Sequence, residues 1–353
     1  MLILVINPGS TSTKVSVFEN DKELFSETLR HSKEELSKYG RIIDQYQFRK
    51  EIIFDFLRRN NIAVSSLSAV VGRGGLLKPI PGGTFLVNEE ILEDLKTAKY
   101  GEHASNLGAI LAYEIAKEAG CPAYIVDPVV VDELEDIARV SGLKGLNRRS
   151  IFHALNQKAV ARKAARDLGK DYSKVNLIVA HLGGGISIGA HKGGRVVDVN
   201  NALNGDGPFT PERCPTIPTL KLLELFRKGM SLDTLMKRIV GSGGLVAYFG
   251  TNSALDVERK IDSGDFLAET VLRAMAYQIS KWIGKMASAL EGNIDAIVIT
   301  GGMAHSKRIV SWIKERVSFL APVMVYPGED EMEALAFGAL RVLRGEEEHK
   351  IYK

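Results

Sequence analysis

The sequence has few of the features that mark secreted, zinc-binding or membrane proteins. Its only cysteines are Cys121 and Cys214, too few for a disulfide framework and without the spacing of a metal site. This usage favours a reducing, cytoplasmic location. No apolar run is as long as a membrane span, and the short apolar start lacks the basic segment of a signal peptide. We therefore expect no membrane partner.

A strong charge of one sign is also missing. Lysine and arginine number 46 against 43 acidic residues, a net charge of +3, and no ladder of aromatic and basic residues occurs. Nucleic-acid-binding domains are usually far more basic, so we expect no nucleic-acid partner. The hydrophobic share of 45% and charged share of 25% are typical of a globular protein. The length of 353 residues predicts about two domains.

What is present is an alternation of strand and helix patterns, which predicts an α/β fold. Residues 2–6 are apolar, Pro8-Gly9 turns the chain, and residues 14–18 alternate polar with apolar, so a hairpin is expected. The same order returns at residues 175–199, where glycine turns separate three strands. We interpret this as a topological duplication with a boundary near residues 145–175.

The remaining elements follow from helical spacing and from short apolar runs between turn residues. Helices are expected at residues 48–59, 103–120, 150–168, 219–228, 231–240 and 266–290, and strands at the start of 68–75 and at 122–128. Residues 295–310 predict a strand, a Gly-Gly turn and a helix, and residues 324–345 predict a strand and a closing helix.

Four glycine-bearing turns lie between predicted strands or after them, at residues 7–12, 183–185, 193–194 and 301–302. Glycine lets backbone N–H groups come close to a phosphate and tolerates positive φ. One such turn is usually an ordinary hairpin, but several together favour phosphate binding. The P-loop and protein-kinase patterns are absent, and the dinucleotide pattern fails because Ile188 stands where its third glycine would fall.

Charged residues stand beside these turns at predicted strand ends and in loops, where α/β proteins bind ligands. They are Arg73, Asp127, His181, Arg213 and Glu331. Each alone has an ordinary interpretation, as a helix cap, a solvated arginine or a structural histidine. As a set they fit phosphoryl transfer, which needs cationic donors around the phosphoryl oxygens and a divalent cation held by one or two carboxylates.

Eight segments together give the chain a family resemblance from residue 2 to about residue 345. They read NPGSTSTK, VVGRGG, EHASNLGA, VDPVVVDE, RRSIFHALNQKAVAR, HLGGGISIGAHKGGRVVDVNNALNGDGPFTPER, ITGGMA and PGEDEMEALAFGAL. With them the chain resembles the acetate kinase family, within the superfamily of acetate and sugar kinases, heat-shock chaperones and actin. HLGGG and PGEDEMEALA are most similar to its butyrate kinase branch.

The resemblance implies a two-domain, actin-like or ribonuclease H-like α/β fold with a duplicated βββαβα core and a cleft between the domains. It implies an N-terminal domain of residues 1–147, with a closing helix of about 332–353 packing back on it, and a C-terminal domain of residues 148–331. The implied reaction is reversible phosphoryl transfer between ATP and a short-chain carboxylate, giving an acyl phosphate and ADP, with Mg²⁺. A homodimer or larger homo-oligomer is also implied.

The resemblance further implies roles for individual residues. Asn7, Ser10, Ser12 and Lys14 match the first phosphate motif, and Gly183, Gly184 and Gly185 match the second phosphate turn. Arg73 and Arg213 match the arginines that hold the carboxylate and the phosphoryl group. His103 and His181 match the active-site histidines, with His181 donating to the phosphoryl oxygens. Asp127 and Glu331, with Asn7, match the residues linked to magnesium. Gly301, Gly302 and Met303 would line the adenosine.

Two places depart from the family pattern. Ser253 and Leu255 stand where relatives carry an acidic and a basic residue that touch the adenosine. Cys214 and Pro215 follow Arg213 where relatives have small, flexible residues, and proline restricts its neighbours. Two rival functions stay open from the residues: an acetate or propionate kinase, and an actin-like protein that uses ATP as a conformational switch.

Overall fold

The structure of the protein is a computed structural model that describes residues 1–203 and 205–353, and it divides into two compact units. Unit 1 comprises Met1–Val131 and Asp330–Lys353, and unit 2 comprises Asp132–Glu329. The sequence placed the first boundary at 147. Residues 132–147 belong to unit 2 because Glu133 Oε2 accepts hydrogen bonds from Lys158 Nζ and Val196 N, both at 2.8 Å.

Unit 1 is built on a seven-stranded sheet in the order β12-β5-β6-β4-β1-β2-β3. Its strands are β1 (Leu2–Pro8), β2 (Ser12–Glu19), β3 (Lys22–Arg30), β4 (Ala69–Gly72), β5 (Thr84–Leu86), β6 (Ala123–Val126) and β12 (Lys350–Ile351). The predicted opening hairpin is confirmed, with Asn7 opposite Lys14. Because β1, β4 and β6 are parallel, their carboxyl ends meet at one edge of this sheet.

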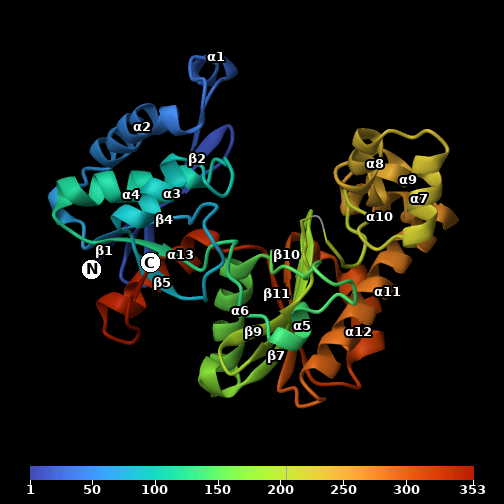
Figure 1. The fold of residues 1–353 in the computed structure, drawn as a ribbon. Coiled ribbons are helices and arrows are strands. Elements are labelled where there is room, and N and C mark those ends of the chain that lie inside the picture. Colours follow the sequence, from blue (N-terminus) through green and yellow to red (C-terminus); the bar gives the residue numbers. More distant parts are fainter. Residues whose placement is uncertain (204) are drawn as a thin grey trace. The chain divides into compact units, whose positions relative to one another are not determined.

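Helices cover the sheet of unit 1 (Figure 1). They are α1 (Lys33–Leu36), α2 (Tyr46–Arg59), α3 (Glu89–Lys96), α4 (Asn106–Ala119) and α13 (Glu331–Leu343), with single 3₁₀ turns at Ile43–Gln45 and Val64–Ser66. Helix α4 crosses β4 so closely that a Cβ on Gly72 would lie 2.0 Å from the carbonyl oxygen of Gly108. The closing helix α13 packs on β1, β4 and β6.

Unit 2 is built on a five-stranded sheet in the order β11-β10-β7-β8-β9. Its strands are β7 (Asn176–Leu182), β8 (Ile186–Lys192), β9 (Arg195–Val199), β10 (Ala296–Gly301) and β11 (Val323–Pro327). Strands β7, β8 and β9 form an antiparallel meander like β1, β2 and β3, and β10 pairs parallel to β7 as β4 pairs to β1. The predicted duplication is confirmed.

The two faces of this sheet are covered by different helices. Helix α11 (Phe266–Ala289) and α12 (Lys307–Val317) pack with one set of apolar side chains from the strands, and α6 (Ala154–Asp167) packs with the other set. The other helices are α5 (Asp136–Arg139), α7 (Thr219–Arg227), α8 (Leu232–Ile239), α9 (Gly244–Phe249) and α10 (Ala254–Asp262), with 3₁₀ turns at Tyr172–Lys174 and Gly302–His305. Among the described residues, no helix is both long and apolar enough to cross a membrane.

Candidate functional site

Three predicted residues meet at the strand ends of unit 1. Glu331 Oε2 accepts hydrogen bonds from Asn7 Nδ2 at 2.8 Å and from Arg73 Nη1 at 2.6 Å. Arg73 Nη1 also lies 3.4 Å from Asn7 Oδ1. The three side chains therefore form one charged cluster, although they are up to 324 positions apart in the sequence.

The sheet and α13 explain this convergence. Asn7 is the second-last residue of β1, Arg73 follows the neighbouring parallel strand β4, and Glu331 is the first residue of α13. The Arg73 amide donates to the carbonyl of Ile6 at 2.9 Å, which fixes the arginine beside the strand end. Both side-chain bonds of Arg73 use Nη1, and within the described part of the chain its Nε and Nη2 make no hydrogen bond or ion pair. The guanidinium thus keeps N–H donors for an oxyanion.

His103 lies in the loop that leads into α4, close to the same cluster. Its Nδ1 is 2.8 Å from Ser105 Oγ and accepts from the Ser105 amide at 3.2 Å. The pKa of His103 is below its usual value, first because the surrounding protein removes water from the ring and then because of the Arg73 guanidinium. Asn106 links the segment that follows Arg73 to the loop that contains His103. Its Oδ1 accepts from the Leu76 amide at 2.9 Å, and its Nδ2 donates to the Gly101 carbonyl.

The first phosphate turn rests on a side chain that we did not predict from the sequence. Arg49, 1% exposed, donates through Nη1 to the carbonyls of Gly9 (2.8 Å) and Ser12 (3.0 Å), and its Nη2 reaches the Ser10 carbonyl at 3.4 Å. Burial lowers the pKa of Arg49 to about 10. Lys14, opposite Asn7 in the hairpin, is exposed.

The direction of these carbonyls matters for the turn. In a planar trans peptide the C=O and the following N–H point in opposite directions. Because the carbonyls of Gly9 and Ser10 face Arg49, the amides of Ser10 and Thr11 point away from it. The turn therefore presents N–H groups on its outer side, which is the arrangement of an anion-binding turn.

Asp127 occupies the end of β6, on the far side of β4 from β1. Its Oδ1 accepts from the Gly83 amide at 2.7 Å, and its own amide donates to the Gly83 carbonyl at 3.0 Å. The residue is 2% exposed and has φ of 37°, a left-handed conformation that is uncommon outside glycine. These contacts give Asp127 a part in shaping the backbone.

The three residues matched to magnesium differ in how well they fit a metal. Mg²⁺ is usually held by one or two protein carboxylates together with phosphate oxygens and water. Glu331 Oε2 binds Asn7 Nδ2 and Arg73 Nη1, but its Oε1 makes no hydrogen bond among the described residues and suits the ion, and Asn7 Oδ1 lies 3.4 Å from Arg73 Nη1 in the same cluster. The Asp127 carboxylate is occupied by Gly83. Among residues 1–203 and 205–353, no group of three or more His, Cys, Asp or Glu side chains is arranged to hold a metal ion.

A second cluster surrounds His181 at the end of β7 in unit 2. With 1% of its surface exposed, His181 has Nδ1 2.8 Å from Asn156 Oδ1, on α6. Its Nε2 is 3.1 Å from Glu329 Oε1 but is not aligned for a hydrogen bond. The ring of His153 stacks on it, with centroids 3.8 Å apart and planes 12° apart. His153 was not singled out from the sequence.

The glycine turn at residues 183–185 holds Arg213. Thr210 Oγ1 donates to the Gly184 carbonyl at 2.8 Å and accepts from the Arg213 amide at 3.1 Å. Arg213 Nη1 donates to Ala202 O at 2.5 Å, and a Cβ on Gly185 would lie only 2.6 Å from it. A Cβ on Gly183 would lie 3.1 Å from His181 Nε2. The glycines are required here for space around functional side chains.

The other two glycine turns are placed differently. Gly193 and Gly194 close the β8–β9 hairpin, at the opposite end of β8 from the 183–185 turn, and both have positive φ. The 301–302 turn follows β10 at the same edge as His181. Gly301 has φ of 91° and would place a Cβ 2.4 Å from the Leu182 carbonyl oxygen. Met303 is 9% exposed and belongs to the core of unit 2, so it offers a ligand little side-chain surface.

The departures from the family pattern have local structural roles. Ser253 is the N-cap of α10, and its Oγ accepts from the Asp256 amide at 3.1 Å. Leu255 is exposed on the same helix. The Cys214 amide donates to the Ile239 carbonyl at 3.0 Å, which anchors the chain after Arg213 to the end of α8.

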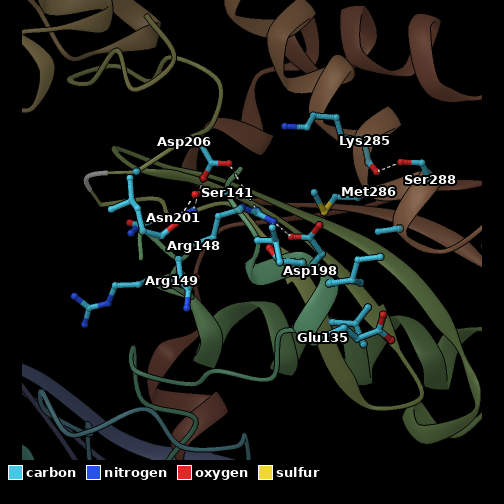
Figure 2. Close-up of a pocket in the computed structure, with 18 of the residues that line it drawn as sticks. Glu135, Ser141, Arg148, Arg149, Asp198, Asn201, Asp206, Lys285, Met286 and Ser288 are labelled. Carbon is cyan, nitrogen blue, oxygen red and sulfur yellow. Dashed lines mark hydrogen bonds and ion pairs between the residues drawn. The ribbon is translucent and has the colours of Figure 1, made fainter. Parts of the chain in front are cut away.

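Unit 2 also contains a cavity of about 980 Å³ between the segment around residues 135–149, β9 and α11 (Figure 2). Arg148 Nη1 in this cavity is 2.9 Å from Asp198 Oδ1 and donates to the Ala138 carbonyl at 2.7 Å. The pKa of Lys285, which also lines the cavity, is lowered first by burial. Arg148 is thus engaged in holding the 135–149 segment to the sheet.

Comparison with known proteins assigns the family. A sequence model of the acetokinase family matches residues 136–322, more than half of the chain. The chain belongs to the acetokinase family. It is accordingly an ATP-dependent carboxylate kinase of that family.

Solved structures support the fold of this acetokinase-family chain. An acetate kinase from Porphyromonas gingivalis is 20% identical, with a TM-score of 0.79, covering 97% of this chain and 99% of that one. A propionate kinase from Francisella tularensis subsp. tularensis SCHU S4 is 20% identical, with a TM-score of 0.73 and coverage of 96% and 98%. An acetate kinase from Entamoeba histolytica is 18% identical, with a TM-score of 0.74 and the same coverage. The predicted two-domain, actin-like α/β fold is confirmed.

Proposed function

We propose that this chain catalyses the reversible phosphorylation of a short-chain fatty acid by ATP, with butyrate as the main substrate. The products are an acyl phosphate and ADP. The observation that carries the proposal is the pair of arginines Arg73 and Arg213, each held beside a strand-end turn with N–H groups left for an oxyanion. A protein that only hydrolyses ATP as a switch has no need for such a carboxylate-receiving pair.

The proposed mechanism follows from charge. The substrate carboxylate is ionised at neutral pH, since carboxylic acids have a reference pKa of about 4. It therefore attacks the γ-phosphorus in line without a general base. The main barrier is the approach of two anions, which Arg73, Arg213 and a histidine donor offset through preorganised hydrogen bonds. We assign the histidine role to the stacked pair His153 and His181.

Asn7 and Glu331 are the residues that we propose for Mg²⁺. When bound, the ion would neutralise charge on the polyphosphate oxygens. The outward amides of the first turn and the glycine turn at residues 183–185 are proposed to bind phosphate oxygens. The backbone of Gly301 and Gly302 is proposed to line the adenosine. For Asp127 we propose an indirect role, because its carboxylate holds the Gly83 amide.

Two features support a substrate larger than acetate, and one supports the smaller acids. HLGGG and PGEDEMEALA are most similar to the butyrate kinase branch. The solved structures of similar fold are named as acetate and propionate kinases. A change of one methylene in an apolar site alters binding by only about 1–3 kcal/mol. Acetate and propionate are therefore the second candidate substrates.

Trapping the acyl phosphate with hydroxylamine tests the proposal. The purified chain is incubated with ATP, Mg²⁺ and one acid at a time from acetate to valerate, and hydroxamate and ADP are measured together. We expect equal amounts of both, with the highest kcat/KM for butyrate. ADP release without hydroxamate for any acid would support the ATP-switch function instead. A maximum at acetate or propionate would retain the reaction and overturn the butyrate assignment.

A further inference from the structure

A continuous set of hydrogen bonds runs behind the stacked pair His153 and His181, through residues to which no role has been assigned. His153 Nδ1 is 2.9 Å from Ser187 Oγ on β8. Gln157, on α6, donates through Nε2 to Ser187 Oγ at 2.7 Å and to the Ser187 carbonyl at 3.0 Å. Gln157, Ser187 and the next member, His191, are each fully buried.

The Ser187 carbonyl fixes the direction of the whole chain. A backbone carbonyl only accepts hydrogen bonds, so the group of Gln157 that faces it is the NH₂ group. Gln157 Oε1 then faces His191 Nε2 at 3.0 Å, and this nitrogen carries a hydrogen because an amide oxygen only accepts. Gly189 makes room for the contact, since a Cβ there would lie 2.6 Å from Gln157 Oε1.

The far end of the chain is set by Tyr172. Its hydroxyl is 2.7 Å from His191 Nδ1. The pKa of His191 lies well below its usual value, first because the ring is fully buried and then because of the charges of Lys158 and Arg162. With His191 neutral and its hydrogen on Nε2, Nδ1 accepts and the Tyr172 hydroxyl donates.

At the other end of the chain of hydrogen bonds, Ser187 determines which ring nitrogen of His153 carries the hydrogen. Ser187 Oγ accepts from Gln157 Nε2 at 2.7 Å and from the backbone amide of His153 at 3.5 Å. With its lone pairs facing these N–H groups, the Ser187 hydroxyl directs its own hydrogen to His153 Nδ1. His153 therefore carries its ring hydrogen on Nε2. Its Cε1, which is bonded to both ring nitrogens, would lie 3.3 Å from a Cβ on Gly185, so this edge of the ring lies at the proposed phosphate turn.

We propose that Ser187, Gln157, His191 and Tyr172 are positioning residues that hold His153 as the neutral Nε2–H tautomer. In this form the ring presents an N–H donor at the 183–185 turn without needing a charge. His181 differs, because its Nδ1 hydrogen is directed to Asn156, so its Nε2 carries a hydrogen only in the imidazolium form. The consequence for turnover rests on the proposed kinase function, whereas the tautomer itself does not.

The tautomer is measured by long-range ¹H–¹⁵N correlation spectra of the intact chain with ¹⁵N-labelled histidine, and the His153 signals are assigned as those lost in His153→Asn. We expect the Nε2–H pattern in the wild type. Ser187→Ala removes the donor to Nδ1, so we expect a mixture of tautomers and a kcat about tenfold lower, with the KM for ATP changed by less than about twofold.

Tyr172→Phe removes only the terminal hydroxyl from a partly exposed residue. It is therefore the second test variant, used if Ser187→Ala does not fold. We expect new exchange broadening at His191 and a loss of kcat of about twofold to threefold. Tyr326→Phe is the matched control, because its hydroxyl donates to Asp167 Oδ2 at 2.5 Å elsewhere in unit 2. It is expected to change neither readout.

Three results would overturn the proposal. They are an Nδ1–H tautomer of His153 in the wild type, an unchanged tautomer in folded Ser187→Ala, and a shifted tautomer with unchanged kcat. If the wild type forms no acyl phosphate, the proposed function fails, and the spectra alone still decide whether the chain of hydrogen bonds sets the tautomer.

Discussion

The two proposed phosphate turns occupy equivalent places in the duplicated fold but are built from different chemistry. Each joins the first and second strands of its sheet, β1 to β2 in unit 1 and β7 to β8 in unit 2. The turn of unit 1 is organised from behind by Arg49, which binds its carbonyls. The turn of unit 2 is organised by glycines that give space to His181 and Arg213 and by the Thr210 hydroxyl.

This difference teaches that duplication has preserved the position of a turn and not the means of holding it. In unit 1 a buried cation orients the peptide groups, and a neighbouring cluster supplies the charged side chains. In unit 2 the side chains of His181 and Arg213 lie directly against the glycines of the turn. Unit 1 should therefore be sensitive to loss of a buried charge, and unit 2 to the addition of a methyl group.

Removing either proposed substrate arginine should give the largest effect. We expect Arg73→Ala and Arg213→Ala each to lower kcat about 10³-fold or more, because each deletes charge stabilisation of the transferring phosphoryl group. The melting temperature should change little. The exposed arginines Arg58 and Arg259 provide controls, one in each unit, as alanine variants. Near-normal turnover in either test variant would remove that arginine from the proposed mechanism.

Arg49→Met tests the buried charge behind the first turn. The variant removes the donor to the Gly9 carbonyl and one of the two donors to the Ser12 carbonyl, which the Gly9 amide still binds, and a buried unsatisfied group costs about 1–3 kcal/mol. We expect a loss of about 3 kcal/mol in the free energy of unfolding, measured with urea, and about 100-fold in kcat through misplacement of the turn. Arg58→Met, on the same helix but exposed, is the control. Unchanged kinetics in a destabilised variant would make Arg49 purely structural.

Gly185→Ala tests the space required by the second turn. The new methyl group would stand 2.6 Å from Arg213 Nη1, so the guanidinium must move, and we expect kcat to fall about 10–100-fold. Gly184→Ala should lose less, because nothing lies within 4 Å of its Cβ position. Gly9→Ala in unit 1 should also lose less, since its nearest contacts would be at 3.5 Å. Gly284→Ala in α11 serves as a control for expression and assay. Equal losses at residues 9 and 185 would contradict the contrast between the turns.

The sequence predicted the parts of this arrangement that are local. The hairpins follow from period-two alternation, and the charged residues were found because they stand beside glycine turns. Arg49 was missed because helical spacing places it on one stripe with Ile53 and Phe56, a pattern typical of a buried face, without showing what a buried cation would bind. Asp127 shows the opposite case, since its positive φ and its bonds to Gly83 depend on tertiary structure.

His153 was missed for a further reason. It stands just before α6, and no glycine turn adjoins it in the sequence. Only the packing of α6 on the sheet brings its ring onto His181 and its Nδ1 to Ser187. A signal was present in the sequence, because His153, Asn156 and Gln157 are spaced as one face at the start of a helix. It could not be read without knowing which strand the helix covers.

Unit 1 should also show a pH dependence of its stability. His31 Nε2 lies 2.9 Å from Thr13 Oγ1, which also accepts from Arg49. Its pKa is lowered to about 4, first by burial and then by the Arg49 charge. Unfolding restores a pKa of about 6.5, so the unfolded chain binds more protons between these values. This contribution of about 3 kcal/mol is complete above pH about 6.5 and is lost as the pH falls to about 4.

Urea unfolding at several pH values between 4 and 7 measures this contribution. His31→Gln does not titrate, so we expect the slope of the free energy of unfolding against pH to decrease over this window. His349→Gln replaces an exposed histidine of the same unit and should leave the slope unchanged. An equal slope in the wild type and in His31→Gln would mean that neither burial nor the Arg49 charge lowers the pKa of His31 in the folded chain, and the contrast between the turns would then rest on the Arg49 and glycine variants alone.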